Sequence, residues 1–179
     1  MKKILAILGI MAVAGCHQDR HGGGGSAHDP WYITYSNGHP IAAEAESNYI
    51  LDHENEMIDL INVDRALTGL NVLVQSPDIS DVARAHSIHM AISDFEGAYN
   101  PEGDGPEDRA DLAGFFFTRY GENTSAGLFD PVDVFNNWML IPGMHDNLHD
   151  FSWDWIGCGY EEDVFSTFGH YWTVDFLMD

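Results

Sequence analysis

Apolar side chains recur at helical spacing in two long segments of the chain. Residues 44–68 carry them three, four and seven positions apart, which predicts an amphipathic helix that ends at Gly69. Residues 78–93 predict a second helix, with Asp78 as its N-cap. The apolar face of this second helix is formed by Ile79, Val82, Ala83, His86 and Met90. Each segment is therefore expected to bury one face against a core.

The remaining elements are shorter and change character toward the C-terminus. A short helix is predicted over 104–113. Another begins at Asp130 and Pro131, where aspartate is a favourable N-cap and proline suits the first turn. Residues 155–160 and 171–176 are rich in aromatic and β-branched side chains and predict two strands joined as a long hairpin. Helices first and strands last indicate an α+β domain in which helices cover one sheet.

The first residues have the pattern of a bacterial lipoprotein signal. Two lysines precede an apolar stretch, 4–13, that is too short to span a bilayer. The run Val13-Ala14-Gly15-Cys16 then resembles a lipobox. We therefore predict that residues 1–15 are a signal peptide and that lipidated Cys16 anchors the protein to a membrane of the cell envelope, outside the cytoplasm. An ordinary signal peptide with an unrelated cysteine is the alternative.

Residues 16–43 are predicted to form a tether and an N-terminal segment whose structure the pattern does not define. Gly22-Gly23-Gly24-Gly25-Ser26 within them is typical of a flexible linker. The folded domain is predicted over residues 44–179.

The composition limits the partners of this domain. The chain has 179 residues, with 29 acids against 7 lysines and arginines, and a formal net charge of −22. Such a chain offers no basic patch for phosphates, which excludes nucleic acid as a partner and disfavours docking on anionic lipid. Cys158 lies between two glycines in an apolar run, which predicts a small buried side chain rather than a nucleophile.

Seven short motifs, taken in order, resemble the CAP superfamily of cysteine-rich secretory, antigen 5 and plant pathogenesis-related proteins, and most closely its disulfide-free bacterial branch. They are Asn62–Arg65 with Gly69-Leu70, Ala83–Met90, Asp108-Arg109 with Gly114-Phe115, Gly121-Glu122-Asn123, Trp138 with Pro142-Gly143, His145 and Asn147, then Trp155–Gly159, and Gly169–Val174. The resemblance covers residues 44–179. It implies a three-layer α-β-α sandwich, which agrees with the α+β pattern above.

The resemblance also implies a site. CAP proteins that bind metal use two histidines and often two glutamates in a central cleft, and Glu122 and His170 match one of each. Gly97 and Ile141 stand where the other histidine and glutamate would be, and His145 is a candidate third member. We therefore predict that Glu122, His145 and His170 line a ligand-binding cleft, with Zn²⁺ as the metal that these side chains suit.

Two functions follow from this site. The first is a binding module that holds a small molecule, a lipid or a cell-wall component. The alternative is a hydrolase that uses His170 and Glu122 as an acid/base pair, with or without metal. The two replaced positions favour the binding module, as does the lack of a G-x-S-x-G or H-E-x-x-H motif. Purely structural roles for Glu122 and His170 also stay open.

Aromatic residues are the last feature of the sequence. They come from separate segments and predict packing in the core and against the sheet, with an apolar or sugar-stacking groove beside the polar cleft as the alternative. The largest are Trp138, Trp153, Trp155 and Trp172.

Overall fold

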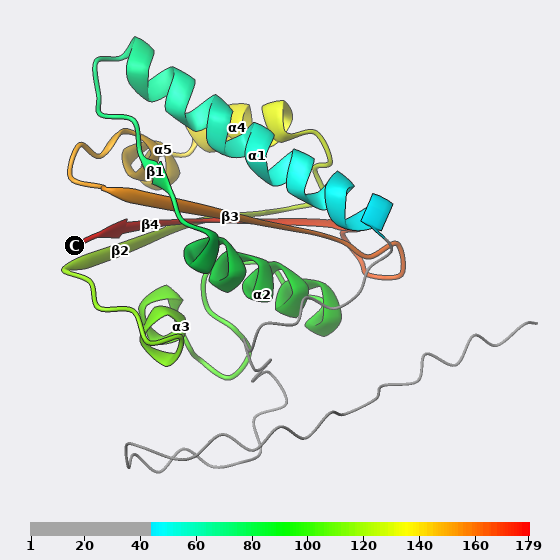
Figure 1. Cartoon of the computed structure of the whole chain (residues 1–179). Helices are drawn as coiled ribbons and strands as arrows, with labels where there is room; N and C mark the ends of the chain where they lie inside the picture. The colour runs from blue at the N-terminus through cyan, green and yellow to red at the C-terminus, as the bar shows by residue number, and fades with distance from the viewer. Residues whose placement is uncertain (1–43) are drawn as a thin grey trace, which may run out of the picture. The chain divides into compact units, whose positions relative to one another are not determined.

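The structure, a computed structural model, describes residues 44–179, with side chains from residue 49 onward. Its helices are α1 (Glu44–Leu67), α2 (Pro77–Ser93), α3 (Pro106–Leu112), α4 (Pro131–Leu140) and α5 (Pro142–His149), and its strands are β1 (Val74–Gln75), β2 (Arg119–Ala126), β3 (Trp155–Glu162) and β4 (His170–Met178). Figure 1 shows the sheet with α1, α4 and α5 on one face and α2 and α3 on the other. The predicted α+β sandwich of three layers is confirmed for these residues.

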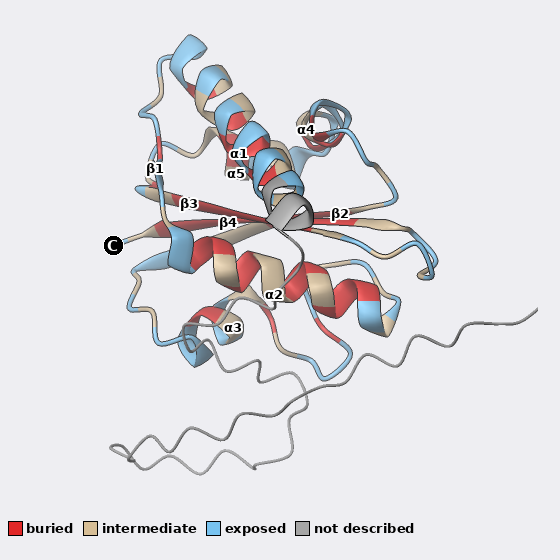
Figure 2. Ribbon diagram, turned by 45° about the vertical axis from the view of Figure 1, so that its right-hand side comes forward, coloured by how far each residue is buried: buried red, intermediate tan, exposed pale blue. Residues whose placement is uncertain are grey.

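The order of the strands places β4 inside the sheet. The sheet runs β1–β3–β4–β2, with β4 antiparallel to both neighbours and β1 parallel to β3. Successive side chains of a strand point to opposite faces. Trp172, Val174 and Phe176 therefore pack toward α1 and α4, whereas Tyr171 and Leu177 pack toward α2. Figure 2 shows that β4 is buried along most of its length. This alternation decides which layer each site residue faces.

Helix ends follow local chemistry, with one correction. The N-cap of α2 is Ser76, whose hydroxyl accepts the backbone N–H three residues on, and not the predicted Asp78. Asp130 caps α4 as predicted, with Pro131 in the first turn. The chain then turns sharply at Ile141, and α5 begins as a separate helix at Pro142.

Two glycines of β3 let α2 lie directly on the sheet. A side chain at Gly157 would overlap the backbone of Ile79 and Ser80, and one at Gly159 would overlap the backbone of Ala83 and Arg84. The G-x-G pattern of this strand therefore serves close packing of a helix against a sheet.

The first motif along the chain is a clamp at the end of α1. The side chain of Asn62 both donates to and accepts from the backbone of Leu73, at 3.1 and 2.8 Å. Arg65 is fully buried and uses its guanidinium to satisfy backbone carbonyls, which belong to Asn71, Leu148 and Asp150. This arginine thus joins α1 to the end of α5.

The predicted signal peptide, Cys16 and the tether lie outside the described residues and stay predictions. Within residues 44–179, no helix is both long and apolar enough to cross a membrane. Cys158 is buried, as predicted. β2 was not predicted as a strand, because its sequence, Arg-Tyr-Gly-Glu-Asn-Thr-Ser-Ala, lacks alternating apolar residues.

Candidate functional site

The Gly121-Glu122-Asn123 motif locks β2 to α5. A side chain at Gly121 would run into the ring of Trp153. The amide of Asn123 donates to the backbone carbonyl of Met144 at 3.0 Å, and Asn147 of α5 donates back to the carbonyl of Glu122 at 3.0 Å. The neighbours of Glu122 therefore fix the strand, and the glutamate is left to project to the other face.

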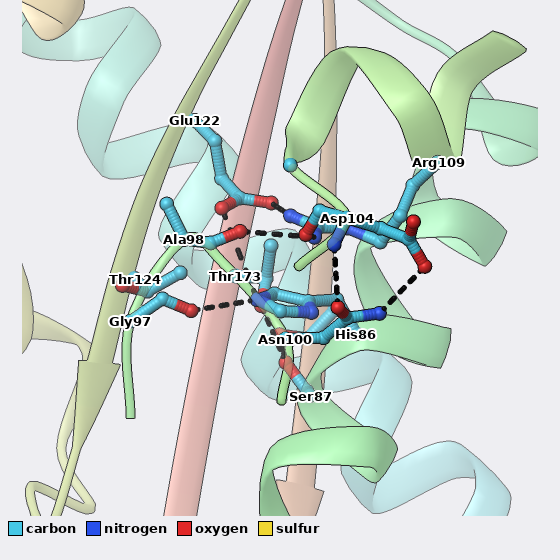
Figure 3. A network of polar contacts seen from close by, with 12 residues as sticks. His86, Ser87, Gly97, Ala98, Asn100, Asp104, Arg109, Glu122, Thr124 and Thr173 are labelled. Atoms are coloured by element: carbon cyan, nitrogen blue, oxygen red, sulfur yellow. Dashed lines mark hydrogen bonds and ion pairs between the residues drawn. The ribbon is translucent and has the colours of Figure 1, made fainter. Parts of the chain in front are cut away.

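Glu122 projects toward α2 and α3 and is held there by an arginine. Its Oε2 accepts a hydrogen bond from Nη2 of Arg109, on α3, at 2.5 Å (Figure 3). Nε2 of His86, on α2, lies 3.9 Å from its Oε1. Only 1% of the glutamate side chain is exposed. A ligand in bulk solvent does not reach an ion pair that is buried this deeply.

The loop between α2 and α3 closes over this pair. Arg109 donates to the backbone carbonyls of Ala98 and Asp104, at 2.9 and 3.2 Å. His86 Nε2 and the carbonyl of Gly97 are 2.9 Å apart. Gly97, which stands where the family's other histidine would be, thus accepts a hydrogen bond from His86. His86 and Arg109, the two side chains that flank Glu122, also hold the loop that covers it.

His86 is neutral in this environment. Burial lowers its pKa to about 3, and the positive charge of Arg109 acts in the same direction. Because a carbonyl oxygen only accepts, the ring must carry its proton on Nε2 to bond Gly97. His86 is therefore a buried core histidine, as its position on the apolar face of the helix predicted.

A second carboxyl group lies beside Glu122 on the neighbouring strand, on the same face of the sheet. Asp175 of β4 is its register partner and is 1% exposed. Burial raises the pKa of both acids: that of Asp175 to about 6, and that of Glu122 well above its usual range. Each also acts on the other, Arg109 lowers both, and the hydroxyl of Tyr120 interacts with Asp175. Two buried carboxyls beside one guanidinium are best satisfied when the pair keeps a proton.

His170 lies on the opposite face of the sheet from Glu122. It is five residues before Asp175 on β4, and an odd separation along a strand reverses the face. The ring belongs to the layer of α1 and α4, where its Nδ1 is 2.8 Å from the hydroxyl of Tyr160. Tyr171 is the neighbour of His170 that shares the face of Glu122. The expected convergence of His170 and Glu122 is therefore not what the structure shows.

The surroundings of His170 are aromatic and partly open. The ring of Phe129 lies 5.2 Å from that of His170 and 5.1 Å from that of His53. His53 stacks on Tyr160, with ring centres 5.3 Å apart, and Phe129 stacks with Tyr49 at 6.5 Å. We call Tyr49, His53, Phe129 and His170 the aromatic–histidine surface. Phe129 is 45% exposed and Tyr49 is 37% exposed, so this surface is accessible from outside.

His145 belongs to neither place. Its ring lies 4.4 Å from that of His149, one turn on along α5, and His149 Nε2 is 2.7 Å from Oδ2 of Asp64. Asp64 is eleven residues after His53 on α1, which places the two clusters roughly 16 Å apart along that helix. The three predicted cleft residues therefore occupy three separate environments.

The residues that the structure describes do not fit a metal centre. Among residues 44–179, no group of three or more histidine, cysteine, aspartate or glutamate side chains is arranged to hold a metal ion. Oε2 of Glu122 is bonded to Arg109, and only 1% of the glutamate side chain is exposed. The zinc site suggested by the family resemblance thus has no counterpart in this part of the chain.

Arg109 and Asp175 are the site residues that sequence reasoning missed. Arg109 stood within a recognised motif, Asp108-Arg109, but without an assigned role. Asp175 carried a usable signal, because an acid inside an apolar strand must find a partner or keep its proton.

Comparison with known proteins agrees with this fold. A model of the CAP family, described as the cysteine-rich secretory protein family, matches residues 58–176. An uncharacterized protein of Bacillus subtilis, YkwD, is 29% identical over 125 residues, a match that covers 70% of this chain and 47% of that protein.

Solved structures include similar folds from extracellular and surface proteins. An extracellular protein with an SCP domain from Bacillus anthracis superposes with a TM-score of 0.68 at 22% identity, over 79% of this chain and 45% of that one. An outer surface protein of Borrelia burgdorferi superposes with a TM-score of 0.64 at 19% identity, over 79% of this chain and 98% of that one. The chain thus spans less than half of the two Bacillus proteins.

Proposed function

Because the chain belongs to the cysteine-rich secretory protein (CAP) family, we propose that it is an extracytoplasmic binding module, anchored by a lipid on Cys16, that holds a sugar-bearing component of the cell envelope. Its structural relatives from Bacillus anthracis and Borrelia burgdorferi are described as extracellular and outer-surface proteins. The lipobox-like run that ends at Cys16 supports the same location and supplies the anchor.

The observation that carries the proposal is the aromatic–histidine surface. Sugar rings present apolar C–H faces to aromatic side chains and hydroxyl groups to polar ones. Phe129 and Tyr49 offer exposed, stacked rings. His53 donates through Nδ1 to the carbonyl of Tyr49 at 2.9 Å, which leaves its Nε2 as an acceptor for a hydroxyl. Rigid aromatic anchors beside a few polar groups are the usual makeup of a recognition site.

The alternative, a hydrolase that pairs His170 with Glu122, finds no support in this geometry. The two side chains face different layers of the sandwich, and Glu122 is sealed beneath Arg109 and the loop that follows α2. A general acid or base must come within hydrogen-bond reach of its substrate. The contacts of Glu122 with Arg109 support a structural role for this residue instead.

Titration with soluble disaccharide-peptide fragments of cell wall tests the proposal. We expect saturable binding to the full-length protein by calorimetry and at least a tenfold weaker affinity for Phe129→Ala. Phe116→Ala is the matched control, because Phe116 is exposed to solvent on the loop before β2. Equal binding by wild type and Phe129→Ala, or no binding by either, would contradict the proposed ligand surface. Intact-mass analysis of membrane-extracted protein tests the acyl chains on Cys16 separately.

A further inference from the structure

The turn between β3 and β4 holds apolar side chains out in water. Residues 163–169 form this turn, which we call the hairpin tip. Phe165 is 95% exposed and Val164 is 72% exposed, and Phe168 is also open to solvent. A contiguous exposed apolar group on a folded domain usually marks a contact surface.

Hydrogen bonds within the hairpin tip fix its conformation. The carboxylate of Asp163 accepts the backbone N–H of Phe165 at 2.9 Å, and its carbonyl accepts both the N–H and the hydroxyl of Ser166, at 3.1 and 2.7 Å. The backbone of Asp163 donates to Gly169 at 2.9 Å, which closes the turn. These bonds satisfy the polar groups internally, so that Val164 and Phe165 form the outermost part of the turn.

A second contact fixes the tip to the end of α2. Asp94 accepts two hydrogen bonds from Thr167, from its N–H at 2.7 Å and from its hydroxyl at 2.6 Å. Asp94 stands in the left-handed region, with φ of 55°, where residues other than glycine are uncommon. The backbone thus accepts a strained conformation at the point that orients the tip.

The tip lies at the end of the domain where the described chain begins. Figure 1 shows α1 starting over the end of the sheet where the β3–β4 hairpin turns. The ring of Tyr49, near the start of α1, lies 6.4 Å from that of Tyr160, close to the end of β3. Glu44 is 28 residues after Cys16. A flexible linker of that length has a mean end-to-end reach of about 30 Å.

We propose that the hairpin tip docks in the lipid bilayer that carries the acyl chains of Cys16. The inference rests on the lipid anchor of the proposed function. An anchor at that distance keeps the tip at a high local concentration near the bilayer, so that a small apolar insertion suffices. Inserting Val164 and Phe165 removes apolar surface from water that no other part of the described domain covers.

Charge specifies the kind of lipid. Asp163 lies within the tip, Glu162 directly before it, and Asp94 against it, and residues 163–169 contain no lysine or arginine. Anionic headgroups would repel this end of the domain, and salt would weaken that repulsion. The tip therefore suits zwitterionic lipid.

A probe on the tip tests insertion directly. The chain from residue 16, with Cys16→Ser, is held to phosphatidylcholine vesicles by an N-terminal hexahistidine tag and a nickel-chelating lipid. In the variant Val164→Cys, a fluorophore labels that thiol, because Cys158 is buried. We expect strong quenching by a lipid-borne spin label at position 164, and at least threefold less at the matched control Phe116→Cys. Replacing Phe165 by Ser should reduce the quenching at 164.

Three results would overturn the inference. Equal quenching at positions 164 and 116 means that the tip does not insert. Stronger quenching when phosphatidylglycerol replaces a third of the lipid means that charge, not apolar insertion, drives the contact. Dimerisation in solution that Phe165→Ser abolishes, without quenching on vesicles, assigns the tip to a second copy of the chain. Because the tag supplies the anchor, these outcomes are independent of whether Cys16 is acylated.

Discussion

The two faces of the sheet differ in how far their functional side chains are exposed to solvent. On the α2 and α3 face, the side chains of Glu122 and Asp175 are buried as a carboxyl pair beneath Arg109. On the α1 and α4 face, His170 stands among aromatic rings that are partly open to solvent. The sequence motifs that hold Glu122 and His170 look equally like ligand sites. Only the Glu122 side chain is sealed from solvent. Membership of a family motif alone therefore does not distinguish a structural residue from one that binds a ligand.

The largest expected effect comes from removing the cation of the sealed face. Arg109→Gln leaves the buried carboxyl pair without its guanidinium, and we expect the free energy of unfolding at pH 7 to fall by about 3–5 kcal/mol. The loss should be smaller at pH 5, where both acids can hold protons. Denaturant unfolding at the two pH values measures this. Arg119→Gln is the control, because Arg119 pairs with Asp150 at the surface and should cost about 1 kcal/mol or less.

Asp175→Asn should change how stability depends on pH. The folded-state pKa of Asp175 is raised to about 6 from its ordinary value of 3.8, so the folded protein binds this proton more tightly than the unfolded chain. Its contribution to stability is therefore complete below about pH 4 and is lost as the pH rises through about 6. We expect the variant, relative to wild type, to be more stable at pH 7 than at pH 4 by on the order of 1–3 kcal/mol.

The pH series needs a control, since His86 titrates in the opposite sense. Its folded-state pKa is lowered to about 3, so it favours folding more as the pH rises from about 3 to its ordinary 6.5. Comparing Asp175→Asn with Asp59→Asn, an exposed acid on α1, isolates the carboxyl pair from this background. Parallel curves for wild type and Asp175→Asn would mean that the pair does not share a proton.

The open face should tolerate change with little loss of stability. Phe129→Ala and His170→Ala are each expected to lower the free energy of unfolding by about 1 kcal/mol or less, because neither side chain is fully buried. Phe176→Ala, from the core of the same strand as His170, should cost about 3–5 kcal/mol. Thermal or urea unfolding distinguishes the two classes. A loss of several kcal/mol for Phe129→Ala would assign the aromatic–histidine surface to the core.

The fold could be read from the sequence where a pattern reflects burial. Helical periodicity and an Asp-Pro start place α1, α2 and α4, and the aromatic, β-branched runs place β3 and β4. β2 could not be found this way, because its side chains do not form one apolar face. They bond to α5 and to Arg109, and the strand pairs in register with β4. Its polar sequence is dictated by partners that only the folded chain brings near.

The site was harder to predict than the fold, for a reason of register. The motif around Gly169–Val174 located the strand correctly, but one position along a strand changes the face. His170 and Tyr171 cannot be assigned to a layer without knowing that Asp175 stands opposite Glu122. In the same way, the role of Arg109 depends on a loop that folds back over Glu122, a contact that no local pattern encodes.

Glu122 and His170 belong to separate environments, and histidine ring ¹⁵N spectra test this separation directly. Glu122→Gln should shift the ring signals of His86, which lies 3.9 Å from that carboxylate, and leave those of His170 in place. Tyr160→Phe should do the reverse, because Tyr160 lies 2.8 Å from His170. A shift of the His170 signals in Glu122→Gln as large as that of His86 would mean that Glu122 and His170 share one environment.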